Sequence, residues 1–136
     1  MKKLLLVLAV AVGAVGAAEA ATHTGSVKAT EIEFHIKLSA TSGRAGKTTF
    51  TVKNVGHLAH QFLVLKTNLA AGKLPLKGAT VNVVKAGKLF GGIAGAGLKP
   101  GASKAITLSL PAGHYVLFCN LPAHYKSGQR AAFTVK

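Results

Sequence analysis

The sequence predicts an all-β domain, arranged as a sandwich or a barrel. Residues 30–38 alternate apolar and polar side chains, which is the period of a strand with one buried face. Further runs are rich in β-branched and aromatic residues, and short turn signals with glycine, proline or asparagine separate them. Strands at this spacing within roughly 110 residues are typical of a sandwich or a barrel.

The elements follow from these patterns in chain order. In the alternating segment, the expected buried set is Thr30, Ile32, Phe34, Ile36 and Leu38, and the expected exposed set is Glu31, Glu33, His35 and Lys37. Further strands are predicted at 48–52, 61–65, 106–110, 115–119 and 131–135. Residues 67–101 stay open, since 69–73 fit a short helical turn, 81–85 a strand or turn, and the glycine-rich run 91–97 no single element.

The first 20 residues have the pattern of a signal peptide. Lys2 and Lys3 make a positive start, residues 4–18 are an apolar or small-residue run, and Ala18-Glu19-Ala20 supplies small residues at both positions that a signal peptidase reads. The run is shorter than the roughly 20 residues that span a bilayer. We therefore expect a signal peptide at 1–20 and one domain at 21–136, exported to the periplasm or secreted. A retained N-terminal anchor is the alternative.

The expected mature chain is strongly basic. It keeps 15 of the 17 basic residues and two of the three acidic ones, so its formal charge is +13. The lysines are scattered, tryptophan is absent and no groove-reading or base-stacking motif occurs, which argues against nucleic acid as a partner. We expect the charge to give solubility and attraction to anionic partners, in a monomer without stable membrane insertion.

The motifs of common enzymes are incomplete. Gly46-Lys47-Thr48 matches the end of a phosphate-binding loop, but Thr41 stands where that motif needs its first glycine. The mature chain has only Glu31 and Glu33 as carboxylates, both on the expected solvated face of one strand, which leaves no hydrolase triad or carboxylate pair. The sequence therefore indicates a protein that is not an enzyme.

One group of residues has the composition of a metal site. Cys119 is the only cysteine, so its thiol is buried and inert, exposed and reactive, or bound to a metal. His124 follows five residues later, after a loop with a proline. Thiolate and imidazole are ligands for copper and zinc, and a trigonal Cys-His-His set with a weak axial donor describes a blue-copper centre. The third ligand is expected from residues 54–62, where both His57 and His60 are candidates.

Two signatures resemble those of the cupredoxins, the family of small blue copper proteins, and of its bacterial plastocyanin-like and sulfocyanin-like members. They are Asn54-x-Gly56-x-x-x-His60-x-Phe62 and Cys119-x-x-Pro122-x-His124, the latter with a ligand position five residues further on. With the flanking strands, the resemblance covers nearly all of residues 26–136. It implies a Greek-key β-sandwich, one copper ion held by His60, Cys119 and His124, and one-electron transfer through the exposed edge of His124. It favours His60 over His57 by position.

The chain departs from the family pattern at two positions. Ala123 replaces the glycine that is common before the second histidine, and Gln129 replaces the usual axial methionine. Met1 is the only methionine and leaves with the signal peptide. The resemblance therefore implies the amide oxygen of Gln129 as the fourth ligand, with the carbonyl of Ala59 as the alternative. Because an amide oxygen is harder than a thioether, we predict a lower reduction potential than that of a methionine-ligated relative.

The resemblance also implies supporting roles around the metal. Asn54 is expected to tie the two ligand loops together, and the N–H of Gln61 to point at the Cys119 sulfur. Lys126 and Arg130 are expected to make the copper end positive, which suits an acidic docking surface on a redox partner. The competing function is storage or delivery of copper without redox cycling.

Overall fold

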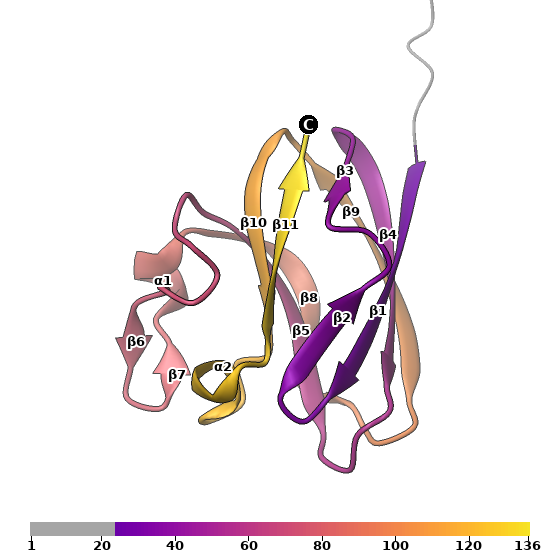
Figure 1. The fold of residues 1–136 in the computed structure, drawn as a ribbon. Coiled ribbons are helices and arrows are strands. Elements are labelled where there is room, and N and C mark those ends of the chain that lie inside the picture. Colours follow the sequence, from indigo (N-terminus) through magenta and orange to yellow (C-terminus); the bar gives the residue numbers. More distant parts are fainter. Residues whose placement is uncertain (1–23) are drawn as a thin grey trace, which may run out of the picture.

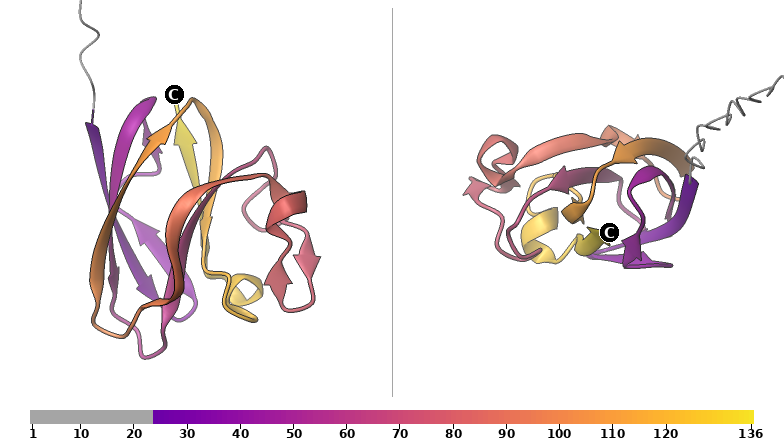
Figure 2. Two further views of the ribbon diagram at one scale, coloured as in Figure 1. Left: turned by 180° about the vertical axis from the view of Figure 1, so that it is seen from behind. Right: turned by 90° about the horizontal axis from the view of Figure 1, so that it is seen from above.

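Two β-sheets pack face to face in the computed structural model, which describes residues 24–136 (Figure 1). The expected signal peptide at 1–20 lies outside the described residues. The all-β prediction is confirmed, and the architecture is a sandwich. Figure 2 shows the sandwich from behind, with β8 and β9 nearest the viewer.

The strands divide unequally between the sheets. The four-stranded sheet has the order β2 (His35–Leu38), β1 (Thr24–Ile32), β4 (Gly46–Asn54) and β9 (Ser103–Leu110). The five-stranded sheet has the order β3 (Ser42–Gly43), β11 (Arg130–Val135), β10 (Gly113–Phe118), β5 (His60–Lys66) and β8 (Lys88–Leu98). Strands β1 and β4 pair in parallel, whereas β10 pairs antiparallel with both β5 and β11. This pairing places the start of β5 beside the end of β10, where the metal-ligand candidates lie.

The main core fills the space between the sheets. Its aromatic centre is Phe50, whose ring centroid lies 5.5 Å from those of Phe62 and Phe133, and all three side chains are fully buried. Aromatic pairs at this separation add stability beyond the area that they bury. Phe62 is two residues from His60, so the same strand anchors the core and carries a candidate ligand.

A second apolar cluster covers the outer face of the five-stranded sheet. The excursion between β5 and β8 packs Leu74, Val81 and Ala86 against Leu63 and Leu65 of β5. The excursion contains β6 (Leu76–Lys77), β7 (Thr80–Val81) and the short helix α1 (Val83–Ala86). The middle of β5, residues 62–65, is buried on both faces and is accordingly continuously apolar instead of alternating.

The excursion and β8 occupy the stretch that the sequence left open. Residues 70–73 form a turn closed by a hydrogen bond from Lys73 N–H to the Ala70 carbonyl, not a helix. The glycine-rich run lies within β8. At Gly92, a Cβ would collide with the Phe62 carbonyl and the Leu63 backbone, so glycine allows β8 to approach β5.

The alternating segment at 30–38 is not one strand but a hairpin, and its predicted faces are wrong in part. The chain turns at Glu33 and Phe34 between β1 and β2, so the inward-facing set changes there. Ile36 is buried as expected, but Ile32 is 45 % exposed and Phe34 38 % exposed. Glu31, expected in solvent, is fully buried.

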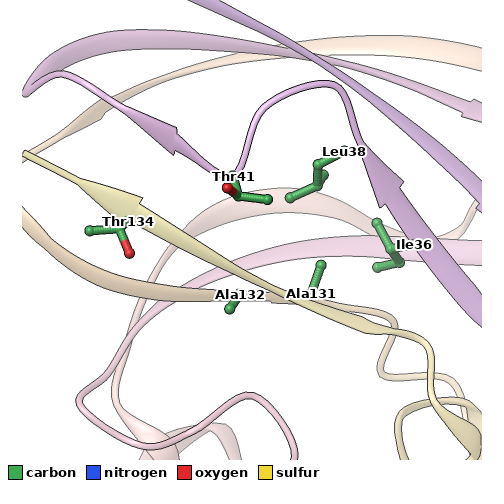
Figure 3. Close-up of a pocket in the computed structure, with 6 residues that line it drawn as sticks. All are labelled: Ile36, Leu38, Thr41, Ala131, Ala132 and Thr134. Atoms are coloured by element: carbon green, nitrogen blue, oxygen red, sulfur yellow. The ribbon is translucent and has the colours of Figure 1, made fainter.

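An apolar pocket opens between β2 and β11 (Figure 3). It is lined by Ile36, Leu38, Thr41, Ala131, Ala132 and Thr134, and none of the predicted metal ligands contributes to it. Among residues 24–136, no helix has both the length and the apolar character needed to cross a membrane.

Candidate metal centre

Three chain segments converge at the end of the sandwich opposite the C-terminus (Figure 1). His60 begins β5, Cys119 directly follows β10, and His124 begins the short helix α2 (His124–Ser127). One ligand atom from each of these residues lies within 4.8 Å of the other two. The structure therefore brings together the three residues that the sequence selected. The rival His57 is exposed and lies outside this cluster.

The donor atoms face one another. Nδ1 of His60 lies 3.3 Å from Nδ1 of His124, and the latter lies 3.4 Å from Sγ of Cys119. The side chains of His60 and Cys119 are fully buried, whereas His124 is partly exposed. Two imidazole nitrogens and one sulfur aimed at a common point are suited to a borderline-soft metal ion.

The Cys119 thiol is fully buried. Burial raises its pKa, while the Gln61 N–H donates a hydrogen bond to Sγ at 3.2 Å and opposes that rise. The expected N–H bond to the sulfur is therefore present. Because the thiolate is the metal ligand, a bound metal ion replaces the thiol proton.

His124 is placed by a strained residue. Ala123, at the start of α2, adopts φ 68°, in the left-handed region that favours glycine. The His124 ring packs edge-on against Phe34, with centroids 5.1 Å apart. Burial and the neighbouring His60 lower the pKa of His124, which favours the neutral imidazole that a metal binds.

The backbone of Gln129 is hydrogen-bonded to both ligand candidates of its loop, Cys119 and His124. Its backbone N–H donates to the His124 carbonyl, and its carbonyl accepts the Cys119 N–H, each at 3.1 Å. Its side chain is fully buried, and Nε2 donates to the His35 carbonyl at 3.3 Å. Within the described part of the chain, the Gln129 Oε1 has no hydrogen-bond partner. A buried acceptor without a partner is costly, and a metal ion would satisfy it.

Asn54 organises only one of the two ligand loops. Its Nδ2 donates to the carbonyls of Leu58 at 2.7 Å and Leu98 at 2.9 Å, and its Oδ1 accepts the Gly56 N–H at 2.9 Å. The expectation that Asn54 joins the two ligand loops is therefore wrong. It ties the loop before His60 to the end of β8.

Both carboxylates of the domain, Glu31 and Glu33, lie near the ligand candidates, whereas the sequence predicted them on a solvated strand face. Glu33 accepts a hydrogen bond from Nε2–H of His60 at 2.9 Å and from the backbone N–H groups of His57 and Leu58. The backbone bonds are the main cause that lowers the pKa of Glu33 to about 2. The one signal in the sequence that could have pointed to these carboxylates is their small number, since the domain has 15 basic residues and only two acidic ones.

Glu31 is the second of these carboxylates. Burial raises its pKa to about 8, and neither of its oxygens has a hydrogen-bond partner among residues 24–136. Its charge, when present, raises the pKa of Cys119. Glu31 is therefore a mostly neutral acid at pH 7, close enough to the thiol to affect it.

Comparison with known proteins rests on solved structures, because no family model and no curated protein matches the chain. Auracyanin from Roseiflexus castenholzii, reduced with dithionite, is 22 % identical, with a TM-score of 0.56 over 87 % of this chain and 99 % of that one. Rusticyanin from Thiobacillus ferrooxidans is 17 % identical, with a TM-score of 0.63 over 83 % of this chain and 77 % of that one. A methionine-to-glutamine mutant of rusticyanin is 22 % identical, with a TM-score of 0.64 over 83 % and 78 %.

The chain has the cupredoxin fold. At these identities the likeness concerns the fold alone, and rusticyanin itself is a copper protein. In the cupredoxin fold of this chain, the clustered donors His60, Cys119 and His124 stand at one end of the sandwich. The chemistry of the site therefore rests on these side chains and not on the likeness.

Proposed function

We propose that this chain is a type 1 copper electron-transfer protein, built on a Greek-key cupredoxin sandwich and exported by a signal peptide at 1–20. The observation that carries the proposal is the convergence of His60, Cys119 and His124 within 4.8 Å, with His124 alone partly exposed. Copper bound by these residues would supply a one-electron couple between the cupric and cuprous states.

The donor set suits copper. Its thiolate and two imidazoles match the trigonal set of blue-copper sites, which have a long, weak axial bond as the fourth contact. Oε1 of Gln129, which has no hydrogen-bond partner among residues 24–136, supports the amide as that axial donor, in preference to the alternative carbonyl of Ala59. An axial oxygen, being harder than sulfur, favours the cupric ion and a low reduction potential.

The surrounding residues hold the donors in place before a metal binds. The Gln61 N–H fixes the sulfur of Cys119, and the backbone bonds of Gln129 fix the loop that carries Cys119 and His124. A site held in this way changes little between oxidation states, which favours fast electron transfer. The partly exposed ring of His124 is the route by which an electron would reach a partner.

The surface around His124 supports docking to a redox protein with an acidic surface. Lys126 is exposed beside it, in a chain of formal charge +14. Arg130 is less available, because its Nη1 donates to the Tyr125 carbonyl at 2.7 Å. Phe34 and Leu58 add exposed apolar surface at 38 % and 46 %. Complementary charge at the rim of such a surface would speed association at low salt.

Voltammetry of the copper-loaded protein tests this function against copper storage. The proposal expects one equivalent of copper and a reversible one-electron wave. Tight binding of one copper without a reversible wave would favour storage or delivery. The variant His57→Ala is the matched control, because His57 is exposed and outside the cluster, and it should leave the wave unchanged.

A further inference from the structure

We propose that Glu33 is a positioning residue, which holds His60 in the tautomer that binds copper and shifts the site toward the cupric state. The inference rests on the proposed function for its effect on copper. Its structural part concerns the metal-free protein and stands on the contacts of the Glu33 carboxylate.

The hydrogen bond between Glu33 and His60 selects a tautomer. An ionised carboxylate only accepts hydrogen bonds, so the 2.9 Å contact requires the proton on Nε2 of His60. In the neutral ring, Nδ1 then carries the free lone pair. That atom is the one that faces His124, at 3.3 Å from its Nδ1. The carboxylate therefore points the lone pair of His60 at the metal position.

The same carboxylate fixes the loop that leads to His60. The backbone N–H of His57 lies 3.0 Å from both Glu33 oxygens, and the N–H of Leu58 lies 2.8 Å from Oε1. Two backbone N–H groups of this loop and the Nε2–H of His60 thus all donate to the Glu33 carboxylate. Glu33 itself lies in the turn between β1 and β2 of the other sheet. Such contacts from outside the metal's own ligands fix the orientation of a ligating imidazole.

Gly56 makes room for this arrangement. A Cβ at Gly56 would overlap with the Glu33 carboxylate, and the Gly56 N–H donates to Oδ1 of Asn54 at 2.9 Å. The loop that carries Gly56 and His60 therefore packs against the carboxylate of Glu33, a residue distant in sequence. The conformation of the loop before His60 is therefore adapted to the Glu33 carboxylate.

The charge of Glu33 acts on the copper equilibrium. Its carboxylate accepts hydrogen bonds from Nε2–H of His60 and from the backbone N–H groups of His57 and Leu58, and three such donors favour its ionised form. A carboxylate that accepts the Nε2–H of His60 makes Nδ1 a stronger electron donor to a bound metal ion. Its negative charge also stabilises the more highly charged cupric ion relative to the cuprous ion. Removal of that charge favours the cuprous ion.

Glu33→Gln tests the charge at nearly constant shape, and His57→Ala, in the same loop but outside the ligand cluster, is its control. At pH 6 we expect Glu33→Gln to raise the affinity for cuprous relative to cupric ion about tenfold, which equals about 59 mV in a one-electron potential. His57→Ala removes only an exposed side chain and keeps the backbone N–H that donates to Glu33, so it should leave the potential unchanged. A wild-type potential in Glu33→Gln, with the wild-type protein cycling normally, overturns the inference and leaves the proposed function standing.

Nitrogen-15 NMR of the metal-free protein tests the positioning role without copper. The expected result is the Nε2–H tautomer of His60 in the wild-type protein and a mixture of tautomers in Glu33→Ala. An Nδ1–H tautomer in the wild-type protein, or an unchanged Nε2–H signal in Glu33→Ala, overturns the inference. Because no metal is needed, this result is distinct from a failure of copper binding, which would overturn the proposed function.

Discussion

The carbonyl of Gln129 accepts the backbone N–H of Cys119 at 3.1 Å, so the candidate axial donor and the thiolate ligand are fixed to each other through the main chain. The side-chain oxygen of Gln129 is buried and unpartnered within the described residues. A substitution at position 129 can therefore change the axial contact while the backbone bond that places Cys119 is kept.

Gln129→Met should raise the reduction potential. A thioether is softer than an amide oxygen and stabilises the cuprous ion, so we expect an increase of about 59 mV or more, a tenfold or larger change in relative affinity. Voltammetry of the two copper-loaded proteins measures it. An unchanged potential would indicate that Gln129 is not the axial donor and would favour the carbonyl of Ala59.

Copper binding should release one proton from Cys119 near neutral pH. Burial raises the pKa of the thiol, so its proton is present before binding, whereas the lowered pKa of His124 leaves that ring neutral. The apparent affinity should then rise about tenfold per pH unit. Calorimetry in buffers of different ionisation enthalpy measures the proton count. Binding without proton release would contradict this assignment.

Glu31 should make the metal-free protein less stable as pH rises from about 5 to about 8. Its pKa is about 8 in the folded state and near its ordinary value of 4.5 in the unfolded chain, so the folded state binds more protons in this window. The free energy of unfolding should fall by at most about 1.4 kcal/mol per pH unit, and by a few kcal/mol in total.

The variant Glu31→Gln isolates this effect from other titrating groups. The difference in unfolding free energy between wild type and variant, measured in urea, should decline across pH 5–8 and level off above it. A difference independent of pH would show that Glu31 is ionised in the folded protein.

Ala123→Gly should stabilise the protein by about 1 kcal/mol. Ala123 has φ 68°, a conformation that costs a non-glycine residue about 1–2 kcal/mol, and part of this is offset by the greater freedom of glycine in the unfolded chain. Urea unfolding of the metal-free variant measures the change. A loss of stability would mean that the Ala123 methyl group contributes more by packing than its backbone strain costs.

The ligand candidates could be found from the sequence because they are encoded locally. Cys119 and His124 share one short loop, and His60 lies two residues before an apolar run at 62–65. The choice of His60 over His57 needed the family signature as well, because both histidines lie in the same short segment. The all-β class was predictable for the same reason, since the strands are marked by β-branched residues and turns, whereas the choice of a sandwich over a barrel came from the family resemblance.

The environment of the ligands was not predictable, because it depends on contacts between distant segments. Alternation continues through the turn at Glu33 and Phe34, so no periodic signal separates one strand from a hairpin. The sequence pattern therefore places both Glu31 and Glu33 on the solvated face. Likewise, the glycine-rich β8 becomes a strand only through its close approach to β5, which the composition of β8 alone does not indicate.

The visible absorption spectrum of the protein with one equivalent of cupric ion tests the central claim most directly. We predict an intense thiolate-to-copper charge-transfer band, which Cys119→Ser abolishes and His57→Ala leaves intact. A cupric complex without this band, or one whose band persists in Cys119→Ser, would contradict the assignment of His60, Cys119 and His124 as a type 1 copper site.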